Sequence, residues 1–312
     1  MASLFETVTG KPAALRDLSA RGLVRASGED RVRFLNGMLT ADVAKLAPGR
    51  AIPALQLDRK GHVLAELWVL AEPDALLLDV APGLEAELTA VLEKHIIADD
   101  VALTSLSAEF AELGVEGPGA RAAALALGLA VPAAGRLERA SFAGESLPLV
   151  GGGSLGEEGL RVIASRAFLP RLREALALPE LSLEAIEVLR IEAAIPELGS
   201  DVTPRNFPQE ARLERAFSLS KGCYVGQEIV ARIASRGAVN RLLVKLRTRE
   251  LVAPGAEIRV ADTAVGQITS SALSSVSGPI ALGYVKVAEA RPGVEVSIGS
   301  VAGEITDDYS RR

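Results

Sequence analysis

The hydrophobic pattern of this chain changes after Arg241, and this change constrains the fold more than any other feature. Beyond it, apolar residues alternate with polar ones at Leu242, Val244 and Leu246, a period of two that is typical of half-buried strands. Turn-forming pairs recur downstream, at Pro254-Gly255, Gly278-Pro279 and Pro292-Gly293. Because this stretch has no helical period, the sequence predicts a small all-β domain from about residue 241 onward.

The residues before this change have a mixed pattern. Short β-like runs lie at 22–26, 52–57, 63–70 and 76–80, and helix-like stretches lie at about 30–39 and 83–94. The same mixture recurs between residues 100 and 195. We therefore expect an α+β fold with antiparallel hairpins, separated from the all-β part near residues 237–241.

Composition limits the class of protein. With 312 residues, of which 49% are apolar, the chain is long enough for two or three domains with real cores. Its net charge of −6 argues against a general nucleic-acid surface. The N-terminal residues have no secretion signal, and no apolar run reaches the roughly 18 residues of a membrane span. One cysteine excludes an intrachain disulfide, so we expect a cytoplasmic protein without a membrane or nucleic-acid partner.

The single cysteine, Cys223, lies in a glycine-bounded turn, Lys-Gly-Cys-Tyr-Val-Gly-Gln-Glu at residues 221–228. Apolar residues follow at a helical spacing and end at Gly237, which predicts a helix over about 226–236. A thiol just before a helix start, with Lys221 nearby, is stabilised as a thiolate because free N–H groups and the helix dipole favour an anion. The alternative is a buried cysteine that packs as a small hydrophobic residue.

Glu192 is a second unusual residue. If residues 183–195 form a helix, Glu192 falls within its apolar arc. A buried carboxylate is costly unless it is paired, so we expect a dedicated partner, either structural, such as a backbone N–H or an arginine, or a ligand. Arg190, three residues from Glu187, is expected to pair with it on the solvated face.

Two motif matches and the histidines point to no site of their own. Residues 151–156, Gly-Gly-Gly-Ser-Leu-Gly, match both a dinucleotide-binding pattern and a hydrolase nucleophile pattern. The following residues 159–164 resemble a strand rather than a helix, and both histidines precede the motif, so a hairpin turn is expected. His62 and His95 are expected to be structural, because no partners at metal-site or triad spacing accompany them.

Residues 221–228 resemble the signature K-G-C-Y-x-G-Q-E of the YgfZ-type folate-binding proteins, which belong to the superfamily of the glycine-cleavage aminomethyltransferase. The resemblance extends along most of the chain, through residues 28–42, 190–196 (with Ala194 in place of a glycine), Asp201, 208–210, 265–270 and 280–284. It implies two α+β lobes over residues 1–110 and 111–238, followed by a C-terminal β-barrel over 239–312.

The resemblance also implies a ligand, tetrahydrofolate or another reduced folate. By this resemblance, Glu192 hydrogen-bonds the pterin N–H edge, and Asp79 occupies the place of an asparagine that helps to hold folate; a polar strand end is the alternative for Asp79. Tyr224 is a candidate to stack on a ring or to anchor its turn. Arg232, with Arg236, either receives the anionic tail of folate or forms a solvated basic face. The further signature residues are Gly222, Gly226, Gln227 and Glu228.

The chain departs from the transferases at an acidic pair, where it has Ala65 and Glu66. A misplacement of a reacting group by about 1 Å can lower a rate by about 100-fold. The transferases also lack the cysteine of the signature. We therefore expect folate-dependent support of iron–sulfur cluster assembly or repair in client enzymes, with Cys223 and Lys221 as the reactive pair. Folate-dependent aminomethyl transfer or demethylation is the alternative, and whether the chain is an enzyme stays open.

One cysteine is too few to hold a stable iron–sulfur cluster, which usually takes four protein ligands. We therefore expect no metal site within the chain. Transient exchange with a client, through a thiol or persulfide, suits a single cysteine better.

Overall fold

The computed structural model describes residues 3–156, 158–237 and 239–306. The chain divides into two compact units. The two-sheet unit comprises Lys11–Leu181 and Arg215–Gln227, and the barrel unit comprises the described residues of Met1–Gly10, Ser182–Glu214 and Glu228–Arg312. Each unit is described by itself.

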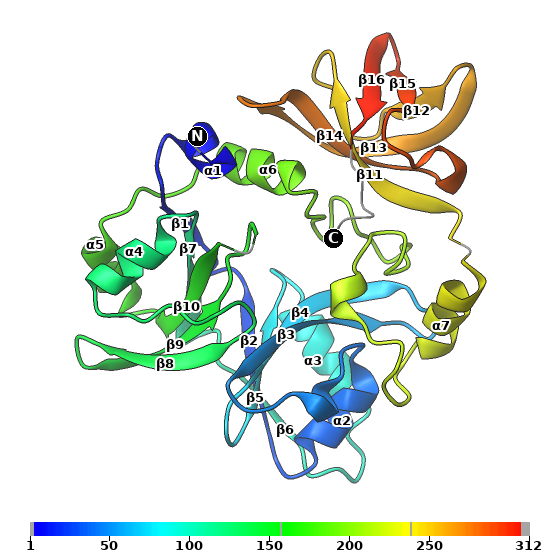
Figure 1. Cartoon of the computed structure of the whole chain (residues 1–312). Helices are drawn as coiled ribbons and strands as arrows, with labels where there is room; N and C mark the ends of the chain where they lie inside the picture. The colour runs from blue at the N-terminus through cyan, green and yellow to red at the C-terminus, as the bar shows by residue number, and fades with distance from the viewer. Residues whose placement is uncertain (1–2, 157, 238, 307–312) are drawn as a thin grey trace. The chain divides into compact units, whose positions relative to one another are not determined.

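The two-sheet unit contains two five-stranded antiparallel sheets (Figure 1). Across the first sheet the strands are β3 (Arg50–Leu57), β4 (Val63–Ala71), β5 (Leu76–Val80), β2 (Gly22–Ser27) and β6 (Ala102–Ser105). Across the second sheet they are β1 (Ala14–Asp17), β7 (Phe110–Glu116), β10 (Gly159–Ser165), β9 (Glu145–Gly151) and β8 (Leu137–Phe142).

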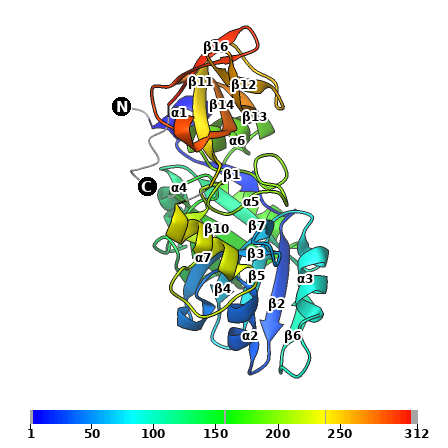
Figure 2. The same ribbon diagram turned by 90° about the vertical axis from the view of Figure 1, so that its right-hand side faces the viewer.

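Helices cover one face of each sheet. On the first sheet, α2 (Arg31–Met38) and α3 (Glu85–Glu93) bury their apolar residues against strand residues such as Leu67 and Val69. Figure 2 shows α3 alongside β2. On the second sheet, α4 (Ala120–Ala126) and α5 (Leu169–Leu176) bury theirs in a separate core. Alternation along the strands turns every second side chain toward these helices.

The other faces of the two sheets pack against each other. This third core joins four residues of the first sheet region to three of the second, namely Leu23, Ala51, Leu70 and Leu77 with Leu137, Val150 and Ile163. Trp68 packs at its margin. Because β4 alternates, its residues Leu64, Glu66 and Trp68 are less buried than their neighbours and lie on the face directed away from the helices.

The barrel unit contains a closed six-stranded barrel. Around it run β11 (Arg241–Thr248), β14 (Gly278–Lys286), β13 (Thr263–Ser274), β12 (Glu257–Val260), β15 (Glu295–Ile298) and β16 (Val301–Ile305) (Figure 1). Alternate side chains fill its interior. On its outer surface, α6 (Leu183–Glu192) packs against β13 and β14, and α1 (Leu4–Thr9) packs against α6.

Among the residues that the structure describes, the remaining elements are α7 (Gln227–Arg236), which begins at the last residue of the two-sheet unit, and three short 3₁₀ helices. These are η1 (Val43–Lys45), η2 (Glu214–Ala216) and η3 (Val287–Glu289). No helix in the described part of the chain combines the length and apolar character needed to cross a bilayer.

The predicted fold class is confirmed, with mixed α+β lobes and a C-terminal barrel that begins at Arg241. The predicted runs at 22–26, 52–57, 63–70 and 76–80 all form strands, and the helix predicted over 226–236 starts one residue later. Gly151 is the last residue of β9, and residues 152–156 belong to the connection between the antiparallel strands β9 and β10, as expected of a hairpin. The lobe boundaries at 110 and 238 stay a prediction.

Candidate functional site

Helix α6 carries Glu192 as its last residue. The helix begins after Ser182, whose hydroxyl accepts the Ala185 N–H at 3.1 Å. It ends three residues earlier than predicted, because Ala194 adopts a φ of 50°, in the left-handed region. Glycine enters this region more easily than alanine, and the resembled superfamily has glycine at this position. The early end places Glu192 at the helix terminus instead of in a helical turn.

The Glu192 side chain is buried against the barrel, with 6% of it exposed. Ser274 Oγ donates to Glu192 Oε1 at 2.6 Å. Lys245 Nζ donates to the Glu192 backbone oxygen at 2.8 Å and lies 3.6 Å from Oε2. The expected burial and dedicated partner are therefore confirmed, although the partners are a serine and a lysine from the barrel. The part in folate binding stays a prediction.

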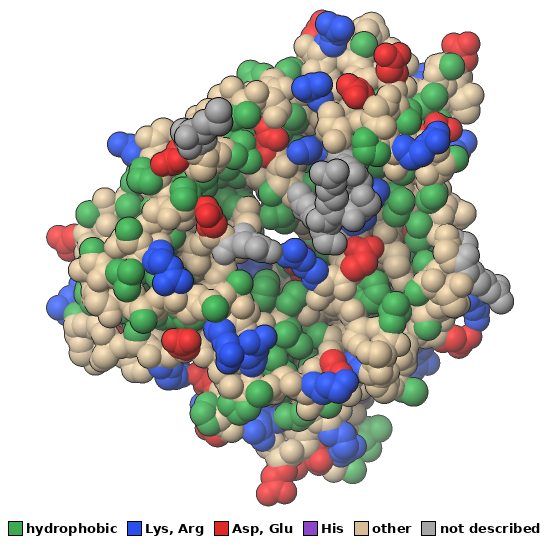
Figure 3. All heavy atoms as spheres, viewed as in Figure 1, with side chains coloured by type: hydrophobic (Ala, Val, Ile, Leu, Met, Phe, Trp, Pro, Cys, Tyr) green, Lys and Arg blue, Asp and Glu red, His purple; other side chains and the backbone are tan. Residues whose placement is uncertain are grey.

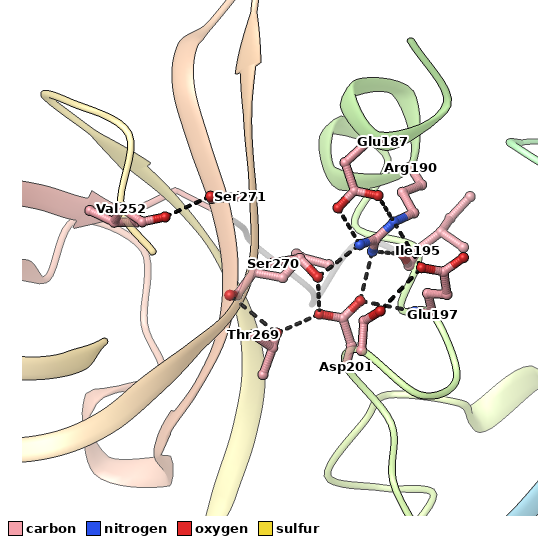
Figure 4. A network of polar contacts seen from close by, with 11 residues as sticks. Glu187, Arg190, Ile195, Glu197, Asp201, Val252, Thr269, Ser270 and Ser271 are labelled. Atoms are coloured by element: carbon pink, nitrogen blue, oxygen red, sulfur yellow. Dashed lines mark hydrogen bonds and ion pairs between the residues drawn. The ribbon is translucent and has the colours of Figure 1, made fainter. Parts of the chain in front are cut away.

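Arg190, two residues before Glu192, is also buried (Figure 4). Its guanidinium donates to both carboxylate oxygens of Glu187, at 2.7 and 2.5 Å, and to Asp201 Oδ2 at 2.6 Å. It also donates to the Ile195 oxygen at 3.3 Å and to Ser270 Oγ at 2.7 Å. Burial by itself lowers the Arg190 pKa, but the hydrogen bonds and charges of Glu187 and Asp201 raise it above its ordinary value.

Asp201 completes this network from the loop that follows α6. Its Oδ1 accepts Ser270 Oγ at 2.7 Å and the Thr269 hydroxyl, and its Oδ2 accepts the Glu197 N–H at 2.9 Å. The predicted Arg190–Glu187 pair is confirmed, but its predicted place on a solvated face is wrong. Ser270 and Asp201, which are 80 and 11 residues away from Arg190 in the chain, cover the guanidinium.

In the two-sheet unit, Lys221 anchors the loop of residues 221–228 to the end of α2. Its side chain is buried, and Nζ donates to three backbone oxygens, those of Asn36 at 2.6 Å, Leu39 at 2.5 Å and Ala41 at 2.6 Å. Carbonyls at a helix C-terminus have no partner within the helix, so an ammonium stabilises them. Burial lowers the Lys221 pKa to about 8. A part for Lys221 in thiol chemistry stays a prediction.

Tyr224 is buried in the same loop. Its hydroxyl donates to the Ser218 oxygen at 3.2 Å, and the Lys221 ammonium lies 4.8 Å from its ring centroid, a cation–π arrangement. Burial raises the Tyr224 pKa to about 12. These contacts favour the anchoring alternative for Tyr224 over stacking on a ligand.

Gly226 and Gln227 also hold the loop in place. Gly226 has a φ of 83°, and a Cβ there would lie 2.7 Å from the Asp58 oxygen in the turn between β3 and β4. Both the conformation and the close approach require glycine. Gln227 Nε2 donates to the Lys221 oxygen at 3.2 Å, which ties the end of the loop to its start.

Cys223 is exposed, so the alternative of a buried structural cysteine is wrong. Three residues separate Cys223 from Gln227, the first residue of α7. The thiol is therefore farther from the helix start than predicted. Its neighbour Gly222 is also exposed, with open space where a Cβ would lie. The thiol is thus presented on a loop whose buried side chains hold it against the first sheet.

The end of the signature continues onto the surface of α7. Glu228, with 82% of its side chain exposed, accepts Arg232 Nη2 at 2.5 Å. This i,i+4 pair favours the solvated-face alternative for Arg232, because its guanidinium already has a partner. The side chain of Arg236 lies outside the described part of the structure.

Asp79, on β5, lies in a buried cluster of charges between the two sheets. Arg21 Nε donates to Oδ1 at 2.5 Å, and Arg161 Nη1, on β10, donates to Oδ2 at 2.6 Å. The Arg161 guanidinium also lies 4.6 Å from the ring centroid of Trp68. Asp79 is therefore paired on both oxygens and is 2% exposed, unlike the polar strand end that was the alternative. Its part in folate binding stays a prediction.

Glu112, on β7, belongs to the same cluster but is less well satisfied. Its Oε1 lies 3.2 Å from Arg161 Nη1, and its Oε2 lies 3.7 Å from Arg21 Nε. Within the described residues, neither oxygen has a hydrogen bond with good geometry, and neither does Arg161 Nη2. Burial raises the Glu112 pKa to about 7, aided by the charge of Asp79 and opposed by the two arginines.

The departure from the transferase pattern lies on β4. Ala65 is buried, whereas Glu66 points to the opposite face, the one that carries Trp68. Burial raises the Glu66 pKa; the charge of Arg21 opposes this and that of Asp79 reinforces it. Glu66 therefore belongs to the electrostatic environment of the buried cluster.

The histidines have local partners. His62 Nδ1 lies 3.0 Å from Asp58 Oδ2, and His95 Nδ1 lies 2.9 Å from the Val91 oxygen. Among the described residues, no three His, Cys, Asp or Glu side chains gather as a metal site does. On the described part of the face in Figure 3, acidic and basic side chains are interspersed.

Five contacting residues were not predicted from the sequence: Arg21, Glu112, Arg161, Lys245 and Ser274. Their partners are far along the chain; Arg161 is 82 residues from Asp79, and Ser274 is 82 residues from Glu192. One local signal was present for two of them, because Glu112 and Arg161 are charged residues with apolar neighbours on both sides in their strands. A buried charge of this kind requires a partner.

Comparison with known proteins gives matches along nearly the whole chain. The model of the GCVT N-terminal domain matches residues 7–221, and that of the glycine cleavage T-protein C-terminal barrel domain matches residues 241–306. A putative transferase from the chloroplast of Arabidopsis thaliana is 29% identical over 93% of this chain and 69% of its own. An aminomethyltransferase of Saccharopolyspora erythraea is 30% identical over 92% of this chain and 82% of its own.

A solved structure has the same fold. The crystal structure of glycine cleavage system aminomethyltransferase T from Bartonella henselae superposes with a TM-score of 0.88. It covers 98% of this chain and 88% of its own, with 23% sequence identity. At this identity the likeness extends to the fold alone.

Proposed function

Because the chain belongs to the glycine cleavage T-protein family, we propose that it binds a reduced folate and uses the Cys223 thiol to support iron–sulfur clusters in other enzymes. One observation carries the second part of this proposal. In the signature loop, Lys221, Tyr224, Gly226 and Gln227 all hold the backbone in place, whereas Cys223 is exposed. A thiol that has no packing role in a tightly held loop is available for chemistry.

The folate part of the proposal rests on Glu192. A carboxylate offers about four lone-pair sites, and among the described residues only Ser274 donates a hydrogen bond to this one. Glu192 can therefore accept N–H donors from a pterin ring while it keeps its barrel partner. A bound reduced folate supplies a carrier for one-carbon groups. Asp79 is less suited to direct contact, because each of its oxygens already accepts an arginine N–H.

The client part of the proposal rests on the number of cysteines. A single thiol per chain, exposed and without a second cysteine, suits a brief exchange with a cysteine of another protein. Iron–sulfur enzymes are the clients that the signature suggests. The partners of this chain are then folate, held stably, and client enzymes, held transiently.

Aminomethyl transfer is the second candidate, and the names of the relatives support it better than the first. Glu66 also favours it, because a half-buried carboxyl whose pKa is raised by burial can take part in proton transfer. Against it stands Ala65, which removes one acid of the transferase pair. Under the first proposal, the chain keeps the family fold and binds folate but does not catalyse aminomethyl transfer.

Titration calorimetry with tetrahydrofolate tests the shared folate claim. We expect the wild-type chain to bind, and Glu192→Ala to weaken binding by about 1.5–3 kcal/mol, the usual contribution of a hydrogen bond to a charged group. Glu228→Ala is a matched control, because that glutamate is exposed and pairs with Arg232. Equal affinity of Glu192→Ala and wild type removes Glu192 from the site.

An assay with aminomethylated carrier protein separates the two candidates. The first proposal predicts that the purified chain does not form methylenetetrahydrofolate from it at a useful rate. Robust turnover that is lost in Glu66→Gln would instead establish the transferase, and the thiol would then need another explanation.

A further inference from the structure

Two barrel residues contact Glu192, and nothing in the sequence pattern points to either. We propose that Ser274 and Lys245 are positioning residues that hold the Glu192 carboxylate ready for the N–H edge of a bound ligand. This inference rests on the proposed folate function. It assigns to the barrel an indirect part in ligand recognition, through Glu192.

Ser274 fixes one oxygen of the carboxylate. It is the last residue of β13 and is 3% exposed. Its Oγ accepts the N–H groups of Val276 at 3.1 Å and Ser277 at 3.2 Å, which occupies both of its lone pairs. Its single proton is therefore directed to Glu192 Oε1, at 2.6 Å. The hydroxyl cannot rotate toward another acceptor without losing these amide contacts, so Oε1 is held in one place.

Lys245 fixes the backbone and orients the second oxygen. Its Nζ, on β11, donates to the Glu192 backbone oxygen at 2.8 Å, a carbonyl at the C-terminus of α6. The same ammonium lies 3.6 Å from Oε2, beyond the usual hydrogen-bond length. The positive charge thus lies beside Oε2 without a hydrogen bond to it. Among the described residues, no hydrogen bond reaches that oxygen, so it can accept one from a ligand.

This arrangement favours one class of ligand. A carboxylate with both oxygens oriented suits a planar edge that carries two neighbouring N–H donors, since two parallel N–H···O bonds can form. The amide and amine edge of a pterin has this pattern. A ring with acceptors at this edge would face a buried negative charge and leave it unsatisfied. The pair Ser274 and Lys245 therefore makes Glu192 selective for donor edges.

A double-mutant cycle tests the inference with tetrahydrofolate as the probe. We expect Ser274→Ala and Lys245→Met each to weaken binding about tenfold, a factor that corresponds to about 1.4 kcal/mol. In a Glu192→Ala background, neither substitution should weaken binding further, because each acts through Glu192. Ser274→Thr keeps the hydroxyl and should restore binding to within about twofold. Thermal melting of every variant checks that it is folded.

Ser271→Ala is the matched control. Ser271 lies on the same strand, and its hydroxyl donates to the Val252 oxygen at 2.6 Å, away from Glu192. We expect it to bind tetrahydrofolate as the wild type does. If the wild type binds while Ser274→Ala and Lys245→Met bind equally well, the inference fails and the folate proposal stands. Effects that persist undiminished in the Glu192→Ala background also overturn it. A wild type that does not bind removes the folate proposal and this inference together.

Discussion

Each unit of the chain buries a network of arginines and carboxylates, and the two networks differ in how fully they are satisfied. In the barrel unit, every nitrogen of the Arg190 guanidinium donates at least one hydrogen bond, and Asp201 accepts four (Figure 4). In the two-sheet unit, both carboxyl oxygens of Glu112 and one nitrogen of Arg161 lack hydrogen bonds among the described residues.

The difference separates a network that only stabilises from one that also holds a titratable group. A charge with all its hydrogen bonds made is fixed in its ionised form, so the Arg190 network acts as a staple between α6 and β13. Burial without hydrogen bonds disfavours the ionised form of a carboxyl, and it raises the pKa of Glu112 to about 7. The second network also contains Asp79 and adjoins Glu66, the two positions that the family resemblance assigns to folate and to catalysis.

The largest expected effect concerns the satisfied network. Asp201→Ala leaves the Arg190 guanidinium buried without a main partner, and we expect it to destabilise the barrel unit by about 3–5 kcal/mol. Hydrogen exchange of β13 and β14 measures this loss. Glu197→Ala is the control, because that side chain is half exposed and lies 3.9 Å from Arg190 Nε. If both variants exchange alike, the network is not a staple.

A smaller loss of stability is expected when the buried ammonium of Lys221, which donates to backbone carbonyls, is removed. Lys221→Met removes the ammonium donor from three carbonyl oxygens of residues 36–41, of which that of Ala41 keeps the Val43 N–H, and we expect a loss of about 2–3 kcal/mol in the two-sheet unit. Urea unfolding followed by the fluorescence of Trp68, the single tryptophan, reports on this unit. Lys60→Met, at an exposed turn, is the control. A Lys221→Met protein as stable as the control would show that the loop is not anchored in this way.

The network around Glu112 predicts that the stability of the two-sheet unit depends on pH. The Glu112 pKa is about 7 in the folded chain and 4.5 ordinarily, so the folded state binds the proton more tightly. Its contribution to stability is therefore full below about pH 4.5 and is lost as the pH rises through 7. The charged groups facing it are Arg161, Asp79 and Arg21.

Glu112→Gln should remove this slope, and we expect it to be more stable than the wild type at pH 8 by about 1–2 kcal/mol. Urea unfolding at pH 5 and pH 8, followed by Trp68 fluorescence, measures the change. Glu109→Gln, an exposed residue just before β7, should keep the wild-type slope. A Glu112→Gln protein with an unchanged slope would contradict the account of the second network.

Much of the fold could be predicted from the sequence because the signals are local. The short, mainly apolar runs of β4 and β5 and the apolar–polar alternation of β11 predict strands, and the glycines and prolines after Arg241 mark the turns of the barrel. The end of α6 could not be predicted in this way. Ala194 takes a left-handed conformation that its residue type disfavours, so tertiary contacts outweigh local preference there.

The candidate sites were predictable only in part. Glu192 could be identified because a carboxylate on an apolar helix face needs a partner, and Cys223 because it is the single thiol in a glycine-bounded turn. The solvated position predicted for Arg190 was wrong, since helical spacing does not show what other segments cover a side chain. The partners of Asp79, Glu112 and Glu192 lie more than 30 residues away, so only the folded chain identifies them.

The measurement that tests the central claim most directly is complementation by Cys223→Ala in cells that lack this protein. Cys223 is exposed, so its replacement should change stability by no more than about 0.5 kcal/mol and leave tetrahydrofolate binding intact. The account predicts that this stable, folate-binding variant fails to sustain iron–sulfur enzyme activity. A Cys223→Ala protein that is stable and complements fully would contradict the thiol function.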